Sequence, residues 1–304
     1  MSKIERSNLC PVCFSNNNDS NIFLKKNINL KELNIHSFSS RKIPEFMNYE
    51  LIKCSDCDLI YAINIPDLNH LYGNYSNSIF SSKKQEEEAA DTYFKILNKC
   101  VKFKNKNKAF EIGSSSGSFL AKLKKLGFKK VRGVEPSYSS INSANEEIKK
   151  SLLQGFFENP SLFYGDQDLI CCFMTLEHVY NPLAVLDKCY KMLNNNGKLI
   201  IVVHNHNYIL NRILGKKSPI IDIEHLQLFS EKSIIKALEN SKFSKIKTQR
   251  IVNSYNLSYW LSLLPLTKTY KKKILSFIKF IKFNNLKISI NVGNIMVIAN
   301  KNDL

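Results

Sequence analysis

The stretch "AFEIGSSSGSFL", residues 109–120, decides the expected fold. Residues of strand-forming character lead into an acid, and a bend rich in glycine and serine then leads into an amphipathic run. Glycine lets the backbone approach a ligand closely, and the amide groups at a helix start can bind it. Gly113 and Gly117, with Ser115 between them, therefore predict a ligand-binding turn between a strand and a helix.

Strand and helix patterns alternate along the chain after this turn. Continuous apolar runs, such as residues 168–174 and 197–203, are typical of strands buried on both faces. The alternation predicts an α/β fold with a mainly parallel sheet between two layers of helices. Glu135 ends the second strand, 22 residues after Gly113, where a carboxylate can accept the hydroxyl protons of a ribose. The turn lacks the GxGxxG spacing of dinucleotide sites and the GKS or GKT of phosphate-binding loops.

The eight cysteines fall into two groups. Cys10 and Cys13 form "CPVC", and Cys54 and Cys57 form "CSDC". Two such turns can supply four thiolates to one tetrahedral zinc ion, and four sulfur ligands leave no open position for catalysis. Residues 1–78 are therefore expected to form a zinc-binding ribbon and linker, with a ribbon that holds no metal as the alternative. The other cysteines lie in apolar runs and are expected to be buried: Cys100, Cys171, Cys172 and Cys189.

The chain has 304 residues and a formal net charge of +18, with 44% hydrophobic residues. This composition is ordinary for a globular protein, and no apolar run is long enough to span a bilayer. The first residues lack the apolar core of a secretory signal, so we expect a cytoplasmic protein. Because the lysines are spread over many segments, most of the charge is expected to be solvated surface, with nucleic acid or an anionic membrane as alternative partners.

The ordered set of motifs resembles class I S-adenosylmethionine-dependent methyltransferases that carry an N-terminal zinc ribbon and act on sugars. "CPVC" and "LIKCSDCDLIY" are similar to the ribbon, "LYGNY" to its linker, "FEIGSSSGSFL" to the cofactor loop and "GVEPS" to the ribose segment. "DLICCFMTLEHVYNP", "LNNNGKLIIVV" and "EHLQLFS" are similar to the fourth strand, the fifth strand and an acceptor-side segment. The resemblance implies a Rossmann-like, seven-stranded methyltransferase sheet with an antiparallel last strand over residues 79–304, including a helical insert at about 255–288.

The expected cofactor-binding residues for S-adenosylmethionine are Glu111, Gly113, Ser115, Gly117, Glu135 and Phe156. On the acceptor side, the resemblance implies His225 as the base and Glu224 as the group that orients the acceptor or the imidazole. His178 follows the fourth strand and either takes part in catalysis or fixes the turn. Histidine suits proton transfer because its pKa lies near neutrality. His204 and His206 follow the fifth strand and can line the acceptor pocket.

Three positions depart from the family pattern. Ser115 replaces the usual middle glycine, "VVHNHN" replaces a Pro-Asn pair, and Asp222 stands where sugar C-methyltransferases carry tyrosine. The leading hypothesis is methyl transfer to a nucleotide-linked, lipid-linked or glycan-precursor sugar, with oxygen and carbon acceptors both open. The alternatives are a non-catalytic binding protein on the same fold and a nucleic-acid methyltransferase. "MTLEHV" argues against the latter, because base N-methylation generally uses an Asn-Pro-Pro-aromatic turn.

A basic helix is expected near the end of the chain. Ile274, Phe277, Ile278 and Ile281 share one helical face, and lysines lie elsewhere on the helix. We expect the apolar face to pack on the protein's own sheet. The alternatives are a helix that rests on an anionic membrane and one that collects phosphorylated acceptors.

Overall fold

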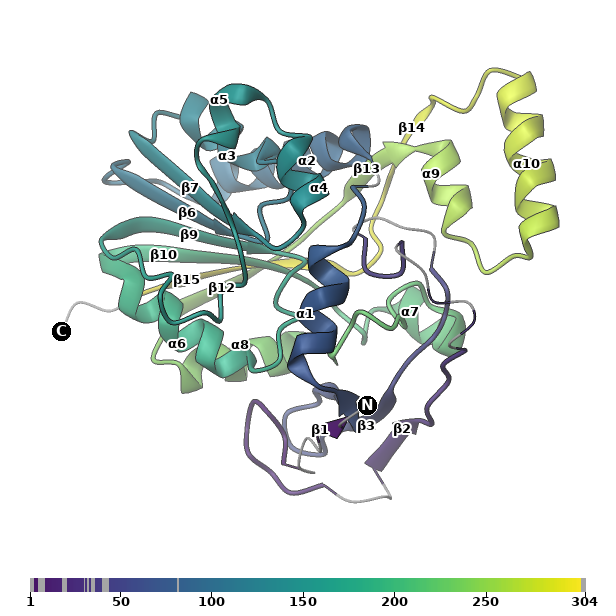
Figure 1. The fold of residues 1–304 in the computed structure, drawn as a ribbon, viewed down its shortest axis with the longest axis horizontal. Coiled ribbons are helices and arrows are strands. Elements are labelled where there is room, and N and C mark those ends of the chain that lie inside the picture. Colours follow the sequence, from purple (N-terminus) through teal and green to yellow (C-terminus); the bar gives the residue numbers. More distant parts are fainter. Residues whose placement is uncertain are drawn as a thin grey trace.

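The computed structural model describes residues 3–4, 9–17, 21–29, 31, 33, 36–39, 44–80 and 82–301. A seven-stranded sheet forms its centre, with the strand order β12-β15-β10-β9-β6-β7-β8 (Figure 1). The strands are β6 (Lys108–Ile112), β7 (Lys130–Glu135), β8 (Leu152–Gln154), β9 (Gln167–Phe173), β10 (Leu193–His204), β12 (Ser244–Arg250) and β15 (Asn294–Asn300). β15 runs antiparallel to both β10 and β12, while β6 to β10 are parallel to one another. The expected sheet with an antiparallel last strand is confirmed.

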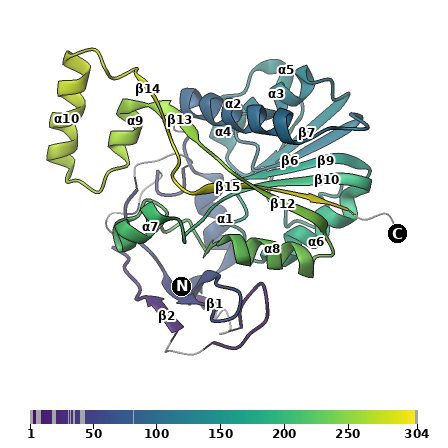
Figure 2. The ribbon, with the colours of Figure 1, turned by 180° about the vertical axis from the view of Figure 1, so that it is seen from behind.

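Helices cover both faces of this sheet (Figures 1 and 2). The main ones are α2 (Lys83–Cys100), α3 (Ser118–Lys125), α6 (Pro182–Met192) and α8 (Glu231–Asn240). Ile170 packs with α6 and α8 on one face, and the next residue, Cys171, packs with α2 and α3 on the other. This alternation is what a strand buried on both faces produces. Cys171, Cys172 and Cys189 are buried as expected, but Cys100 is exposed because it is the last residue of α2.

Two short helices, α4 (Tyr138–Asn142) and α5 (Glu146–Lys149), connect β7 to β8. A four-stranded antiparallel sheet lies next to the main sheet and is made of β2 (Ile22–Leu24), β3 (Glu50–Lys53), β4 (Ile60–Ile63) and β11 (Gln227–Leu228). β1 (Lys3–Ile4) pairs with β5 (Ile65–Pro66), and α1 (Leu68–Ser76) follows. β11 comes from the second half of the chain, where Gln227 pairs with Tyr61. The N-terminal segment and the segment around β11 therefore share one sheet.

Residues 253–290 leave the main sheet between β12 and β15. They contain the strand pair β13 (Asn253–Asn256) and β14 (Lys287–Ile290) and the helices α9 (Leu257–Ser262) and α10 (Lys268–Phe280). α10 packs on α9 and stands away from the body (Figures 1 and 2). Of the expected apolar face, Ile278 is buried but Phe277 and Ile281 are exposed, and the helix packs on α9, so the expectation that this face packs on the sheet is wrong. None of the described helices combines the length and the apolar character that crossing a membrane requires.

Candidate functional site

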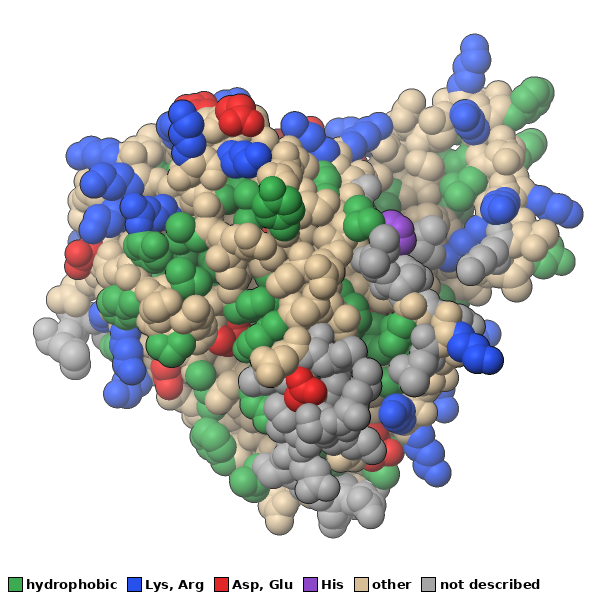
Figure 3. All heavy atoms as spheres, viewed as in Figure 1, with side chains coloured by type: hydrophobic (Ala, Val, Ile, Leu, Met, Phe, Trp, Pro, Cys, Tyr) green, Lys and Arg blue, Asp and Glu red, His purple; other side chains and the backbone are tan. Residues whose placement is uncertain are grey.

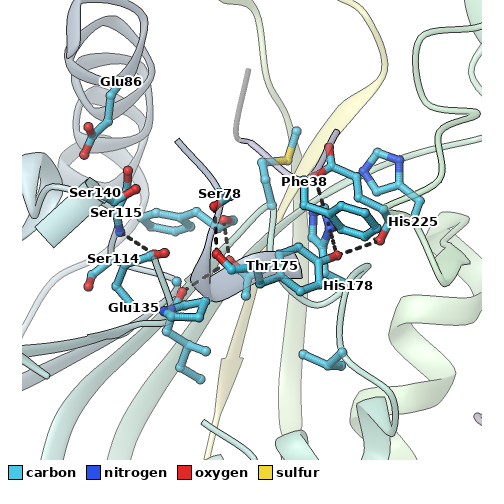
Figure 4. A pocket seen from close by; sticks show the side chains of 18 of the residues that line it. Phe38, Ser78, Glu86, Ser114, Ser115, Glu135, Ser140, Thr175, His178 and His225 are labelled. Atoms are coloured by element: carbon cyan, nitrogen blue, oxygen red, sulfur yellow. Dashed lines mark hydrogen bonds and ion pairs between the residues drawn. The ribbon is translucent and has the colours of Figure 1, made fainter. Parts of the chain in front are cut away.

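A cavity of about 310 Å³ lies at the carboxyl ends of the parallel strands. The turn between β6 and α3, the end of β7 and the turn after β9 form one part of its wall, and the segment around His225 forms another (Figure 4). Gly117 and His206 do not line the cavity, but it brings together the other expected cofactor and acceptor residues: Glu111, Gly113, Ser115, Glu135, Phe156, His178, His204, Glu224 and His225. This is the edge at which ligands bind in open α/β sheets.

The turn between β6 and α3 has left-handed backbone at three positions. The φ angle is 70° at Gly113, 48° at Ser115 and 75° at Gly117. A Cβ on Gly113 would lie 2.2 Å from Thr175 Oγ1, and one on Gly117 would lie 2.3 Å from Ile148 Cγ2. Glycine is therefore required at the outer positions both by φ and by close contact. Ser115 adopts a conformation that costs a residue with a side chain roughly 1–2 kcal/mol.

Glu135 holds this turn from the end of β7. Its Oε2 accepts the backbone N–H of Ser115 at 2.9 Å, and its Oε1 accepts that of Ser137 at 2.9 Å. The carboxylate is buried and points at the turn (Figure 4). The hydroxyl oxygens of Ser114 and Ser115 are buried beside it and have no hydrogen-bond partner among the described residues. Buried polar atoms of this kind are usually satisfied by a ligand or water, so the turn fits a polar cofactor with hydroxyl groups.

Glu86 is a second carboxylate at the turn, and the sequence did not indicate it. Its Oε2 accepts the Ser116 hydroxyl at 2.7 Å, and its Oε1 accepts the backbone N–H groups of Ser116 at 3.2 Å and Ser118 at 3.4 Å. Amides at the start of α3 that were expected to be open to a ligand are therefore bound by the protein itself. Glu86 lies among acids at the start of α2, where the helix dipole explains them equally well, so no local signal marked it.

Phe156 lies on the cavity wall and stacks on Tyr72 from α1. The ring centroids are 4.1 Å apart and the planes are inclined by 28°. Both side chains are half-buried and line the cavity. An aromatic pair of this kind offers a flat apolar surface to a ligand ring.

His225 is buried and lies close to two other histidines. Its Nδ1 is 2.9 Å from the backbone oxygen of Ile220. Because a carbonyl oxygen can only accept, Nδ1 carries the proton and Nε2 is the basic nitrogen. The ring centroid of His225 lies 4.8 Å from that of His178 and 5.4 Å from that of His204. The site therefore groups three imidazoles at one place in the cavity wall.

His178 is tied to the N-terminal segment through Tyr75 of α1. The Nδ1 of His178 lies 3.1 Å from Tyr75 Oη and 3.1 Å from the backbone oxygen of Glu224. The hydroxyl of Tyr75 donates to the same backbone oxygen at 3.0 Å. The carboxylate Oε2 of Glu224 is 3.8 Å from the same nitrogen. Burial raises the pKa of Tyr75 well above its usual value, so the phenol stays protonated as a donor.

Glu177 lies behind these histidines and is fully buried. Its Oε1 accepts the backbone N–H and the Nδ1–H of His204, each at 2.8 Å. Burial alone would lower the pKa of His204, but the charge of Glu177 and the hydrogen bond to it raise the pKa above the usual value. Glu177, His178 and His225 also offer ligand atoms within 4.8 Å of one another, a group that can bind a cation. His204 lines the cavity as expected.

His206 was expected to line the same cavity, and the structure places it elsewhere. Its Nε2 donates to the backbone oxygen of Asp58 at 2.8 Å, next to the second cysteine turn. Burial lowers the pKa of His206, so the imidazole is neutral near pH 7 and donates one proton. His206 therefore connects the end of β10 to the cysteine segment.

Asn253 and Asn294 line the cavity near His204, and the sequence did not point to either. Asn294 on β15 pairs directly with His204 on β10. Both asparagine side chains are buried, and their Oδ1 atoms have no hydrogen-bond partner within the described part of the chain. Tyr255 and Trp260 also line the cavity, with ring centroids 5.3 Å apart. This part of the wall thus combines hydrogen-bonding groups with aromatic faces.

The four cysteines of the two CxxC turns converge in the N-terminal segment. The sulfur atoms of Cys10 and Cys57 are 3.5 Å apart, those of Cys13 and Cys54 are 3.4 Å apart, and all four lie within 4.8 Å of one another. None of the four forms a disulfide. In a regular tetrahedron with Zn–S bonds of 2.3 Å, the sulfurs are about 3.8 Å apart. The donor set and the spacing therefore fit a zinc ion.

Comparisons with known proteins agree with this architecture. A family model described as a methyltransferase domain matches residues 84–248, which is more than half of the chain. A search of curated proteins finds no match.

Solved structures resemble the fold at low sequence identity. An S-adenosylmethionine-dependent methyltransferase from Archaeoglobus fulgidus has a TM-score of 0.50 and 17% identity, over 77% of this chain and 100% of its own. The YcgJ protein of Bacillus subtilis has a TM-score of 0.52 and 13% identity, over 69% and 98%. A protein from an antibiotic biosynthesis pathway of Anabaena variabilis has a TM-score of 0.54 and 12% identity, over 71% and 99%. At these identities the likeness concerns the fold alone.

Proposed function

This chain belongs to the S-adenosylmethionine-dependent methyltransferases, and we propose that it methylates a sugar with His225 as the general base. The observation that carries the proposal is the cavity wall around the histidines. Asn253 and Asn294 present buried amide oxygens that no described residue satisfies, and aromatic rings lie on the same wall. A ligand with several hydroxyl groups on an apolar ring skeleton would match both kinds of surface.

The cofactor half of the proposal assigns the turn between β6 and α3 to S-adenosylmethionine. Glu135 is the proposed partner of the ribose hydroxyls, and Ser114 and Ser115 supply buried hydroxyls nearby. Glu111, which is buried, lines the same part of the cavity, and the pair of Tyr72 and Phe156 is the proposed cover for adenine. Bound S-adenosylmethionine supplies a methyl group on a positively charged sulfur. The protein holds the acceptor in line with that methyl group and excludes water.

His225 is the residue proposed to take the acceptor's proton. In methylation of a hydroxyl, the acceptor oxygen forms a bond to the methyl carbon while the carbon–sulfur bond breaks and its electrons stay on sulfur. The proton of the hydroxyl goes to His225 Nε2, because Nδ1 already carries a proton toward Ile220. Glu224 and His178 are proposed to orient the acceptor and the loop that carries His225. Carbon methylation would use the same nitrogen to form an enolate.

His225→Gln tests this assignment. Its affinity for S-adenosylhomocysteine, measured by calorimetry, is expected to match the wild type, while methyl transfer falls by about 10²–10⁴-fold. The matched control is His36→Gln, an exposed histidine that should leave both quantities unchanged. The acceptors to be tried are nucleotide-linked and lipid-linked sugars with a labelled methyl donor. Label that enters RNA or protein and no sugar would refute the sugar assignment, and unchanged transfer by His225→Gln would refute the base.

A cation held by Glu177, His178 and His225 is a second candidate, because their ligand atoms lie within 4.8 Å of one another. Such an ion would bind the acceptor oxygen and lower its pKa, so that no histidine base is needed. The two mechanisms differ in a simple measurement. Transfer by a histidine base is unchanged when Mg²⁺ or Mn²⁺ is added back to chelator-treated protein, whereas a cation mechanism requires one of them.

The cysteine cluster is proposed to hold one structural zinc ion through Cys10, Cys13, Cys54 and Cys57. The support is the spacing of the four sulfurs, which is close to that of a zinc–thiolate tetrahedron. Zinc there would fix the two turns and the strands that follow them. It would act on the fold and take no direct part in methyl transfer.

A further inference from the structure

The arm, which we define as residues 257–286, exposes a face of aromatic side chains. Tyr270 is 63% exposed, Phe277 is 62% exposed and Phe280 is 84% exposed. Spacings of seven and three place these residues on one side of α10. α10 packs on α9 through its other side, where Ile278 is only 7% exposed. The aromatic face is therefore turned to solvent.

The arm is also strongly basic. Residues 240–302 contain no Asp or Glu, and α10 and the turn after it carry exposed lysines: Lys272, Lys273, Lys279 and Lys282. Figure 3 shows hydrophobic and Lys or Arg side chains together on this part of the surface, at the upper right. An amphipathic helix with aromatic residues on one face and lysines around it is typical of helices that lie in a membrane interface.

A second helix, α7 (Ile209–Leu214), lies at the same end of the molecule (Figures 1 and 2). Ile209 is 58% exposed and Ile213 is 74% exposed, one helical turn apart. Arg212 lies between them, and Lys216 and Lys217 follow; all three are exposed. Exposed apolar side chains thus occur together with basic ones at two places on this end.

We propose that the arm binds an anionic lipid surface, with its aromatic face among the headgroups and its lysines on the lipid phosphates. An anionic membrane would bury the aromatic face and pair with the lysines in the same binding event. Double-stranded nucleic acid would bind the lysines but leave Phe277, Phe280 and Phe283 in water, whereas a single strand would stack its bases on these rings, so RNA binding is one of the outcomes of the test below. A second copy of the chain would cover the aromatic face but bring two sets of lysines together without acids between them.

The arm is connected to the cavity. Trp260 and Leu263 belong to the arm and line the cavity. Trp260 Nε1 donates to the backbone oxygen of Ile288 at 2.9 Å, and Lys271 Nζ donates to that of Ser262 at 2.7 Å, so α9 and α10 are fixed to each other and to β14. Docking of the arm would bring this side of the cavity close to the lipid surface. The binding itself does not depend on which acceptor the enzyme uses.

The test is sedimentation of the full-length protein with lipid vesicles. We expect binding to vesicles of equal parts phosphatidylcholine and phosphatidylglycerol, weak binding to phosphatidylcholine alone, and loss of binding at high salt. Lys272→Gln with Lys279→Gln should weaken partitioning about 30-fold, because each lysine near an anionic surface contributes about fivefold. The control is Lys129→Gln with Lys130→Gln, an equal change of charge on two exposed residues at the amino end of β7.

The aromatic face has its own pair of variants. Phe277→Ser with Phe280→Ser should weaken binding by about tenfold for each side chain, whereas Phe163→Ser, at a residue 52% exposed elsewhere, should have little effect. Far-UV circular dichroism and melting curves check that each variant is folded. Equal binding to both kinds of vesicle, or equal effects of arm and control variants, would overturn the proposal. So would binding to RNA without binding to vesicles, or a dimer that the phenylalanine variants dissociate.

Discussion

Ser115→Gly is expected to stabilise the protein in the absence of cofactor. Ser115 has a φ of 48°, which costs a residue with a side chain roughly 1–2 kcal/mol. Its buried hydroxyl has no partner among the described residues, which costs about 1 kcal/mol more. Glycine removes both costs but adds roughly 0.5–1 kcal/mol of backbone entropy to unfolding. The free energy of unfolding should therefore rise by about 1–2 kcal/mol.

Ser115→Ala is the matched control, because it removes the hydroxyl and keeps the side chain that makes the φ unfavourable. In urea unfolding we expect a smaller gain for alanine than for glycine, and in thermal unfolding a rise of a few degrees for glycine, at roughly 2–4 °C for each kcal/mol. A glycine variant less stable than the wild type would refute the reasoning about the turn. Equal gains for both variants would show that the backbone conformation costs nothing.

The same substitution should also change cofactor binding. If the Ser115 hydroxyl is satisfied by the bound cofactor, then its removal should lower the affinity for S-adenosylhomocysteine by about fivefold in both variants. Higher stability with weaker binding would mean that the turn keeps a strained serine because the cofactor uses its hydroxyl. Unchanged affinity in both variants would remove Ser115 from the proposed site.

Two further predictions concern zinc and pH. Cys54→Ser should remove the zinc found by metal analysis, lower the melting temperature and reduce methyl transfer more than S-adenosylhomocysteine binding; a purified wild type without zinc would contradict it. The pKa of His204 is higher in the folded protein than in the unfolded chain, because His204 pairs with Glu177. The pair therefore stabilises the fold fully at pH values below the unfolded pKa, and this stabilisation is lost as the pH rises through the folded pKa. The stability lost in His204→Gln should therefore be largest near about pH 6 and shrink toward about pH 9, and a loss independent of pH would contradict it.

The fold and the ligand turn could be predicted because their signals are local. Apolar strands, glycines at positions of positive φ and an acid at the end of the next strand all follow from the order of residues along the chain. The sequence shows that serine stands at position 115 in place of glycine, but it does not show that Ser115 has a left-handed backbone. Glu86 could not be found because its partners, Ser116 and Ser118, lie about thirty residues away, and only the packing of α2 brings them together.

The acceptor side was harder to predict for the same reason. His204 ends β10 and His206 lies two residues further on, and nothing local shows that His204 lines the cavity while His206 binds the oxygen of Asp58. Asn294 enters the cavity because β15 returns beside β10, and Asn253 lies two residues after Ile251, whose backbone N–H donates to the oxygen of Asn294. The helix α10 was predicted, but its pattern does not say whether a sheet, a second helix or solvent meets its apolar residues, and Ile278 is buried while Phe277 is exposed.

The position of His225 depends on the N-terminal segment as much as on the methyltransferase sheet. The backbone N–H of Ala62 on β4 donates to the backbone oxygen of Leu226, the residue after His225. The next residues form β11, which pairs with β4. On the other side, the hydroxyl of Tyr75 donates to the backbone oxygen of Glu224, the residue before His225. Glu135 and the cofactor turn, by contrast, are held by β6, β7 and α2. Loosening the cysteine cluster should therefore displace the proposed base while leaving Glu135 and the cofactor turn in place, and the cofactor would lose only the contact with Tyr72 of α1. Zinc loss is for this reason expected to affect transfer more than cofactor binding.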